Sequence, residues 1–521
     1  MKELYSNVVV ESAPRLLCMV DTNPYSQTYG CFDRLYWHYK STDFANARFQ
    51  EAVLTLALLY KNKYDSVYNN QKILDMAVSA LDFWTRIQRK NGSFDEAYPN
   101  ENSFVATAFT TYAATEAFML IEDEIPEDLE RKLLAAFRKA GEWLSENNDF
   151  DAINQTCGAL AALYNVYKIT KEERFLTAVK EKLKIIKDKQ NREGWFPEYG
   201  GPDFGYLSVA IDYLAKYYRA SGDENIIPIA TDAIDFFNYF VYDDGTVGGV
   251  YGSRNTEYII PSGFEVFSEK VPAAREVCYK IIQGLKNKTI ITPQAMDDRY
   301  FVFNSYTYLQ AHDNYNKNKN KPSEIFEKRF PESRLVVIKN KNYFVVIGFN
   351  KGGVFRFHSK NYTYSDAGFV GKTKSGDNVC TQWLDYNYSI KELSVSGKFH
   401  KFDGFLMTPT KTAASRVLLS FGGGKALKSQ ARKKMIKDSP ITDLKFKRSF
   451  VIEENNFQVF DTVEGSDLEK MELADKMSFI HVASSRYFQK QDLSFSNDNT
   501  DIADLINEKG FAEMRRSLGE K

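Results

Sequence analysis

Hydrophobic residues recur with helical spacing through the first three hundred residues of the chain. Apolar side chains at positions i, i+3, i+4 and i+7 predict a long series of amphipathic helices. The predicted helices cover residues 45–60, 72–89, 103–121, 127–146, 153–167, 171–189, 205–219, 225–242, 272–285 and 295–312.

Neighbouring predicted helices differ in charge. Segments 127–146 and 171–189 are heavily charged on one face, whereas 103–118 and 154–167 are almost free of charge and rich in small residues. Charged helices can face water on the outside of a ring, and uncharged helices must pack inside it. The alternation therefore predicts an (α/α) toroid.

A short phrase of glycine, acidic and aromatic residues returns between the helices. Successive copies lie about 45 to 60 residues apart, which is the length of two helices and their loops. This spacing places every copy at the same end of the ring. The copies are residues 30–34, 91–98, 149–154, 193–199 and 243–247.

Beyond residue 334 the spacing of apolar residues changes from helical to the alternation of period two that is typical of strands. Polar residues 314–322 interrupt the helical pattern, and apolar runs at 335–338, 343–347 and 354–358 then predict strands bounded by turns. Further strands are predicted at 414–421 and in a hairpin of 447–452 with 457–463, while the tail from residue 497 stays unplaced. We predict an α+β multidomain protein: an (α/α) toroid catalytic domain (1–313), a linker (314–333) and an antiparallel β-sandwich (334–521).

Composition narrows the classes of partner. The 521 residues contain 68 Lys and Arg against 69 Asp and Glu without long blocks of either sign, so nothing indicates a nucleic acid or a membrane surface. Five scattered cysteines show no metal-binding spacing, and we expect no metal and no cofactor. No apolar run of signal length precedes residue 21, so we expect a cytoplasmic protein unless a leader was removed. The oligomeric state stays open.

Aromatic residues are unusually frequent. The chain has 39 Phe, 32 Tyr and 5 Trp, which together make 15% of its residues. A tyrosine can stack its ring and donate its hydroxyl in a wet cleft, as a sugar site requires. Tyrosine-rich compositions also occur in AT-rich genomes, so both interpretations stand.

Two motifs in the predicted sandwich carry a resemblance. Phe357-His358 precedes Tyr364-Ser365-Asp366-Ala367-Gly368-Phe369, and a later hairpin ends in Asp461-Thr462-Val463-Glu464-Gly465. With the toroid, these motifs resemble the heparinase II/III-like polysaccharide lyases, although the spacing after His358 is longer here. The resemblance implies β-elimination on a uronic-acid-containing polysaccharide or oligosaccharide, which is an acidic partner.

The resemblance also implies catalytic residues. β-Elimination needs the uronate charge masked, a base for the C5 proton and an acid for the leaving oxygen. An asparagine, a tyrosine and a sandwich histidine meet in the cleft of the resembling family, and the matching positions here are Asn154, Tyr206 and His358. Asn154 and Tyr206 lie one repeat apart. The structural alternatives are an N-cap for Asn154, a packing role for Tyr206 with Tyr199 as its rival, and a surface strand position for His358.

Other candidates would bind substrate. Arg34, Trp37 and His38 share one short helix and form a predicted binding wall, unless Asp33 and Arg34 make a structural ion pair. Arg254 suits a sugar carboxylate, because a guanidinium can donate two parallel hydrogen bonds to it. The remaining substrate-binding candidates lie in the repeated loops and are Glu96, Tyr98, Glu198 and Tyr199.

Three competing functions remain open. Asp95, Glu96 and Glu198 would be the catalytic carboxylates of an (α/α) glycoside hydrolase acting on a neutral glycoside. A uronyl C5-epimerase begins with the same proton abstraction as a lyase. A non-catalytic carbohydrate-binding protein could retain the cleft without the chemistry.

Overall fold

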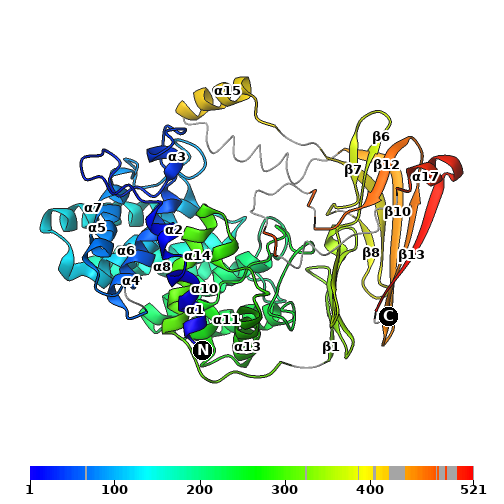
Figure 1. Cartoon of the computed structure of the whole chain (residues 1–521), viewed down its shortest axis with the longest axis horizontal. Coiled ribbons are helices and arrows are strands. Elements are labelled where there is room, and N and C mark those ends of the chain that lie inside the picture. Colours follow the sequence, from blue (N-terminus) through cyan, green and yellow to red (C-terminus); the bar gives the residue numbers. More distant parts are fainter. Residues whose placement is uncertain are drawn as a thin grey trace.

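The computed structural model divides the chain into a helical part and two β-sheets (Figure 1). It describes residues 1–64, 67–322, 325–384, 386–402, 406–421, 440–476, 478–479, 487–489 and 501–519. The helices occupy the left of the view, and the sheets follow at the right in chain order. The predicted fold class, an (α/α) toroid followed by an antiparallel β-sandwich, is confirmed.

The toroid alternates buried and amphipathic helices. Its inner helices pack side by side, and most residues of α6 and α8 are buried. They are α4 (Ala52–Lys61), α6 (Phe104–Ile121), α8 (Ile153–Thr170), α10 (Phe204–Ser221) and α14 (Asp298–Asp313). The outer helices are α5 (Gln71–Arg86), α7 (Glu127–Glu146), α9 (Glu173–Lys189), α11 (Ile226–Asn238) and α13 (Pro272–Asn287). Shorter helices that the periodicity missed are α1 (Glu3–Val10), α2 (Ala13–Leu17) and α12 (Ser262–Phe267), whereas α3 (Arg34–Trp37) forms where a short helix was predicted.

The repeated phrase is first of all a turn. Gly92 and Gly194 have φ angles of 91° and 103°, and a Cβ on either would lie 2.1 Å from a carbonyl oxygen of an outer helix. Glycine is therefore required at both positions by conformation and by space. A side-chain oxygen closes the same turn by accepting a hydrogen bond from the backbone N–H two residues later in the chain. The accepting residues are Asn91, Asn191 and Asp244.

All strands of the sandwich pair antiparallel. The five-stranded sheet has the order β1 (Phe326–Phe330), β2 (Leu335–Lys339), β3 (Tyr343–Gly348), β4 (Val354–Ser359), β5 (Thr363–Asp366). The eight-stranded sheet runs β12 (Leu468–Leu473), β6 (Phe369–Thr373), β7 (Asn378–Cys380), β9 (Ser394–Lys401), β10 (Ile441–Ile452), β11 (Asn456–Glu464), β13 (Phe511–Gly519), and β8 (Asn387–Ser389) pairs with β9. Helix α17 (Ala503–Lys509) and β13 give the previously unplaced tail its position.

The five-stranded sheet is buried on both faces. Val337 and Phe344 belong to the apolar core of the toroid, whereas Val336 and Val345 pack into the core between the two sheets. This explains why β2 and β3 read as continuous apolar runs. The first sheet thus lies between the helices and the second sheet, as Figure 1 shows.

Two segments depart from the predicted strands and linker. Residues 414–421 were expected to form a strand, but they belong to helix α15 (Pro409–Ser420), so that prediction is wrong. Thr408 caps this helix, Pro409 suits its first turn, and its alanines and leucines are strong helix formers. Arg416 pairs with Asp43 at 3.0 Å, so α15 lies beside the toroid near α3 (Figure 1). Strand β1 occupies part of the range expected as linker.

One described segment, Phe104–Glu124, is long and apolar enough to cross a membrane by length and composition. However, 78% of its most apolar window is buried inside the protein. It is the inner helix α6 with its extension, and core burial accounts for its hydrophobicity.

The sandwich motifs of the sequence converge on a buried ion-pair network. Arg448 donates from Nε to Asp461 and from Nη1 to Asp366 at 2.8 Å. Arg516 donates to the same two carboxylates, at 2.6 Å each. The network joins β5 of the first sheet to β10, β11 and β13 of the second, so these motif residues hold the sandwich together.

Candidate active site

Five of the predicted residues meet at the loop end of the toroid. Glu198 is their centre: Asn154 donates from Nδ2 to its Oε2, and Arg254 donates from Nη1 to its Oε1 at 3.0 Å. The guanidinium carbon of Arg254 lies 4.0 Å from the ring centroid of Tyr206 and 4.9 Å from that of Tyr199. The repeat spacing therefore brings residues from three successive repeats into contact.

Asn154 is not the N-cap of its helix. Ala152 occupies that position, and Asn154 is the second residue of α8 with a side chain that is 3% exposed. Its amide reaches sideways to Glu198 instead. The N-cap alternative is wrong, and the residue belongs to the polar cluster.

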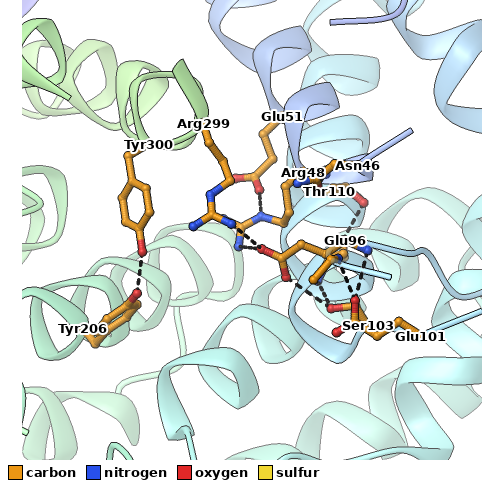
Figure 2. A network of polar contacts seen from close by, with 12 residues as sticks. Asn46, Arg48, Glu51, Glu96, Glu101, Ser103, Thr110, Tyr206, Arg299 and Tyr300 are labelled. Atoms are coloured by element: carbon orange, nitrogen blue, oxygen red, sulfur yellow. Dashed lines mark hydrogen bonds and ion pairs between the residues drawn. The ribbon is translucent and has the colours of Figure 1, made fainter. Parts of the chain in front are cut away.

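The hydroxyl of Tyr206 is hydrogen-bonded to that of Tyr300 at 2.6 Å (Figure 2). Tyr206 comes from the first turn of α10 and Tyr300 from α14, so the bond spans the ring. Burial raises the pKa of Tyr206 well above its ordinary value, and the nearby charge of Arg254 opposes that rise. The tyrosine therefore carries its proton in the resting protein.

Asp203 positions both sides of the cluster. Its side chain caps α10 by accepting the N–H of Tyr206, and its Oδ2 accepts the N–H of Arg254 at 2.9 Å. Lys351, buried in the sandwich contact, donates to Asn255 Oδ1 at 2.6 Å and to the carbonyl of Gly252. The sandwich thus stabilises the loop that carries Arg254.

Glu198 is electrostatically unusual. Its side chain is almost fully buried, and this burial raises its pKa to about 8 despite the opposing charge of Arg254. Asp203 adds to the rise because it brings a second negative charge nearby. Glu198 therefore favours its protonated form at neutral pH while it stays hydrogen-bonded to Arg254.

Two arginines that the sequence interpretation missed flank Glu96. Figure 2 shows Arg48 and Arg299 approaching it side by side from two elements, the 3-10 helix Ala47–Glu51 and α14, with Nη1 atoms 4.0 and 3.9 Å from Oε1. Arg48 is held by Glu51, and Arg299 precedes Tyr300 on α14. These charged side chains therefore extend the polar network from the Tyr206–Tyr300 pair towards Glu96. Neither arginine stands in a recognisable motif, so the local sequence gave no reason to predict it as a site residue.

The carboxylate of Asp95 is used by its own loop. Its two oxygens accept the N–H groups of Asn100 and Asn102 at 2.8 and 2.9 Å. It also lies 3.5 Å from Arg89. These contacts make Asp95 a loop-forming residue and weaken the hydrolase interpretation.

The predicted binding wall is a separate structure. Trp37 donates to the carbonyl of Met19 at 2.8 Å, His38 is exposed, and Arg34 lies over the ring of Tyr39. Asp33 caps α3, and no ion pair joins it to Arg34 in the part of the chain that the structure describes. The contacts of this wall do not link it to Glu198. Tyr98, another predicted binding residue, is 46% exposed.

His358 lies near the end of β4 and faces the fifth repeated loop. Its ring stacks on Tyr242, its Nε2 is 3.8 Å from Asp244, and Thr363 contacts its Nδ1. Burial lowers its pKa. These contacts bring His358 to the interface between the domains, but they join it to Asp244 and not to Asn154 or Tyr206.

Within the described ranges, no group of three or more His, Cys, Asp or Glu side chains is placed to hold a metal ion. The cluster instead offers two amide or guanidinium donors, a neutral carboxyl and a tyrosine hydroxyl. Such a set can bind a carboxylate and move a proton.

The fold is that of the polysaccharide lyases that join a helical toroid to a β-sandwich. Residues 34–260 match the family described as the ulvan lyase N-terminal domain. The predicted resemblance is thus confirmed for polysaccharide lyases in general and not for the heparinase II/III-like family in particular. No curated protein matches the chain.

Two solved structures illustrate the similarity. Streptomyces coelicolor A3 chondroitin AC lyase, solved in complex with chondroitin sulphate, is 10% identical, with a TM-score of 0.57 over 90% of this chain and 67% of that one. Paenibacillus xanthan lyase is 11% identical, with a TM-score of 0.54 over 90% of this chain. The chain spans 46% of the xanthan lyase. At these identities the structures show a shared fold.

Proposed function

We propose that this protein is a polysaccharide lyase that cleaves a uronic-acid-containing glycan by β-elimination. The observation that carries the proposal is the convergence of Asn154, Glu198, Tyr206 and Arg254 at one end of the toroid. The match to an ulvan lyase domain over residues 34–260 supports it independently.

The cluster supplies the groups that the uronate carboxylate needs. Asn154 and Arg254 offer N–H donors, and a protonated Glu198 offers an O–H donor in place of a repelling charge. Together they mask the carboxylate charge, so that the C5 proton becomes acidic. The guanidinium of Arg254 can donate parallel hydrogen bonds to a sugar carboxylate, which favours an acidic substrate over a neutral one.

Tyr206 transfers the protons. Tyr206 first releases its resting proton to solvent, and Tyr300, now the hydrogen-bond donor, and the Arg254 guanidinium stabilise the resulting phenolate. The phenolate takes the C5 proton, the C4–C5 double bond forms and the C4–O bond breaks. The restored phenol then gives its proton to the leaving oxygen, so the elimination is balanced without water.

The test measures the ultraviolet absorbance of unsaturated uronyl products. The panel contains ulvan, chondroitin sulphate, xanthan and, because of the sandwich motifs, heparan sulphate. We expect absorbance with at least one of them and a loss of about 10²- to 10⁴-fold in Tyr206→Phe, the usual range for a proton-transfer group. The absence of product across the panel would exclude the lyase.

His358→Gln tests the remaining predicted catalytic residue. The contacts of His358 with Tyr242 and Asp244 support an interdomain role, and we expect its kcat to stay within about tenfold of wild type. A loss as large as that of Tyr206→Phe would return His358 to the catalytic centre.

A further inference from the structure

A cavity of about 160 Å³ lies between the toroid and the sandwich, beside the proposed active site. The toroid contributes Trp195, Tyr199 and Ser253, and the sandwich contributes Ser333 and Asn350. The cavity is smaller than the sites that take drug-sized ligands, which usually exceed about 300 Å³. Its size suits one ring or one substituent of a larger ligand.

Two polar groups on the sandwich side of the cavity are unsatisfied. Ser333 is 3% exposed and Asn350 is 9% exposed, and neither Ser333 Oγ nor Asn350 Oδ1 has a hydrogen-bond partner among the described residues. The Asn350 amide nitrogen donates to the carbonyl of Tyr251, which assigns Oδ1 as the group left over. Buried polar groups without partners are costly and uncommon, so two at one cavity indicate a missing ligand.

The toroid side of the cavity adds aromatic surface. Trp195 is held in place because its indole N–H donates to Glu193 at 3.0 Å. Tyr199 adopts a φ of 54°, which is uncommon for a residue with a side chain. A fixed aromatic surface opposite a hydroxyl and an amide oxygen suits a sugar, whose ring has an apolar face and a hydroxyl edge.

The charges around the cavity disfavour a second anion. Glu332 lies at its sandwich side and accepts a hydrogen bond from Asn191. Arg334 balances it, but its guanidinium donates to the carbonyl of Leu384 and lies over the ring of Tyr388. The charges of Glu332 and Arg334 offset each other, and the lining residues include no further cation to attract a sulfate or carboxylate.

We propose that this cavity is a subsite for one uncharged, hydroxyl-bearing sugar residue next to the uronate. The inference rests on the proposed lyase function for the glycan. Tyr199 and Ser253 line the cavity, while their chain neighbours Glu198 and Arg254 belong to the catalytic cluster, so the two sites are adjacent. Ser253 also donates to the carbonyl of Glu198, which couples their positions.

The principal test compares Ser333→Ala with Tyr308→Phe. Each substitution removes a buried hydroxyl that lacks a partner, but Tyr308 lies on α14, outside the cavity lining. With the polysaccharide that is cleaved, we expect Ser333→Ala to raise KM by about two- to tenfold, the value of one hydrogen bond, with kcat unchanged. Tyr308→Phe should leave both constants unchanged. Equal KM values in the two variants would overturn the subsite while leaving the lyase intact.

A binding experiment separates failure of the subsite from failure of the reaction. Saturation-transfer NMR with neutral methyl glycosides of glucose, galactose, mannose, xylose and rhamnose needs no turnover. We expect at least one of them to bind the wild-type protein and to bind Ser333→Ala more weakly. If none binds, the subsite is wrong whether or not the protein cleaves a polysaccharide.

Discussion

Glu198 in the toroid and Asp366 in the sandwich are both buried carboxylates, yet their pKa values move in opposite directions. Burial would raise both. At Asp366 the guanidinium groups of Arg448 and Arg516 outweigh it and hold the pKa below its usual range. At Glu198 a single arginine, Arg254, is not enough, and the pKa rises to about 8.

The difference separates a structural network from a reactive one. In the sandwich, two arginines meet two aspartates and every carboxylate oxygen accepts a hydrogen bond. In the toroid, the carboxyl groups of Glu198 and Asp203 both lie beside the single guanidinium of Arg254, and a tyrosine with a raised pKa lies against them. Perturbed groups of this kind concentrate where a protein binds or transforms a ligand.

Arg448→Met gives the largest expected effect on stability. It leaves Asp366 and Asp461 buried with one arginine between them, and removing one partner of a buried ion pair costs about 3–5 kcal/mol. We expect that loss in the free energy of unfolding measured with urea. Activity per folded molecule should stay near wild type, because Arg448 contacts no residue of the proposed active site. A stability loss below about 1 kcal/mol would contradict the structural role.

Glu198→Gln should change how stability depends on pH. The folded pKa of about 8 lies above the ordinary 4.5, so the contribution of Glu198 is fully present below pH 4.5 and is lost as the pH rises toward 8. The slope is at most about 1.4 kcal/mol per pH unit. Urea titrations of both proteins between pH 5 and 8 measure the free energy of unfolding. This free energy should fall less with rising pH in Glu198→Gln than in the wild type.

Asp366→Asn is the control, because the pH dependence of stability that Asp366 contributes has the opposite sign. The folded pKa of Asp366 is lowered, so its contribution is present above the ordinary pKa and is lost as the pH falls through the folded value. Its difference from wild type should therefore change only on the acid side of pH 4. Parallel curves for Glu198→Gln and wild type from pH 5 to 8 would mean that Glu198 is ionised like an ordinary carboxylate.

The sequence predicted the toroid better than the sandwich. Helix α7 was predicted at residues 127–146 and forms there, because its amphipathic pattern is uninterrupted between Pro126 and Asn147. The strand predicted at 414–421 failed because a run of eight residues with five apolar positions fits either period. Tertiary position and helix propensity decide such a case.

The sequence could predict the site residues that lie in or just after the repeated loops. Asn154, Glu198, Tyr206 and Arg254 follow the repeated loops, and regular spacing places such loops at one end of a ring. Tyr300 and Lys351 enter the cluster through α14 and through the sandwich, and no local motif announces them. Their roles depend on contacts between segments about 50 to 100 residues apart in the chain, which periodicity does not encode.

Lys351→Met tests whether the sandwich supports the reactive cluster. The substitution removes the buried donor to Gly252 and Asn255, and acceptors left without a partner cost about 1–3 kcal/mol. Because this loop carries Arg254, we expect KM for the cleaved polysaccharide to rise together with a fall in kcat. Arg334→Met removes another sandwich cation, one that donates to the carbonyl of Leu384 and not to the Arg254 loop, and it should lower stability without the same loss of kcat. Unchanged kinetics in Lys351→Met would show that the loop holds its position unaided.

Glu469→Gln should have the smallest effect on stability of the charge substitutions proposed. Glu469 pairs with Lys372 across β12 and β6 at 3.0 Å, but both side chains are about half exposed, at 52% and 47%. Water screens such a pair, and exposed ion pairs typically contribute about 0–1 kcal/mol. We expect the free energy of unfolding to change by less than about 1 kcal/mol in urea titrations, and added salt to remove that small difference. A loss comparable to that of Arg448→Met would show that burial does not distinguish the charge pairs of this sandwich, and the contrast between Asp366 and Glu198 would then need another cause.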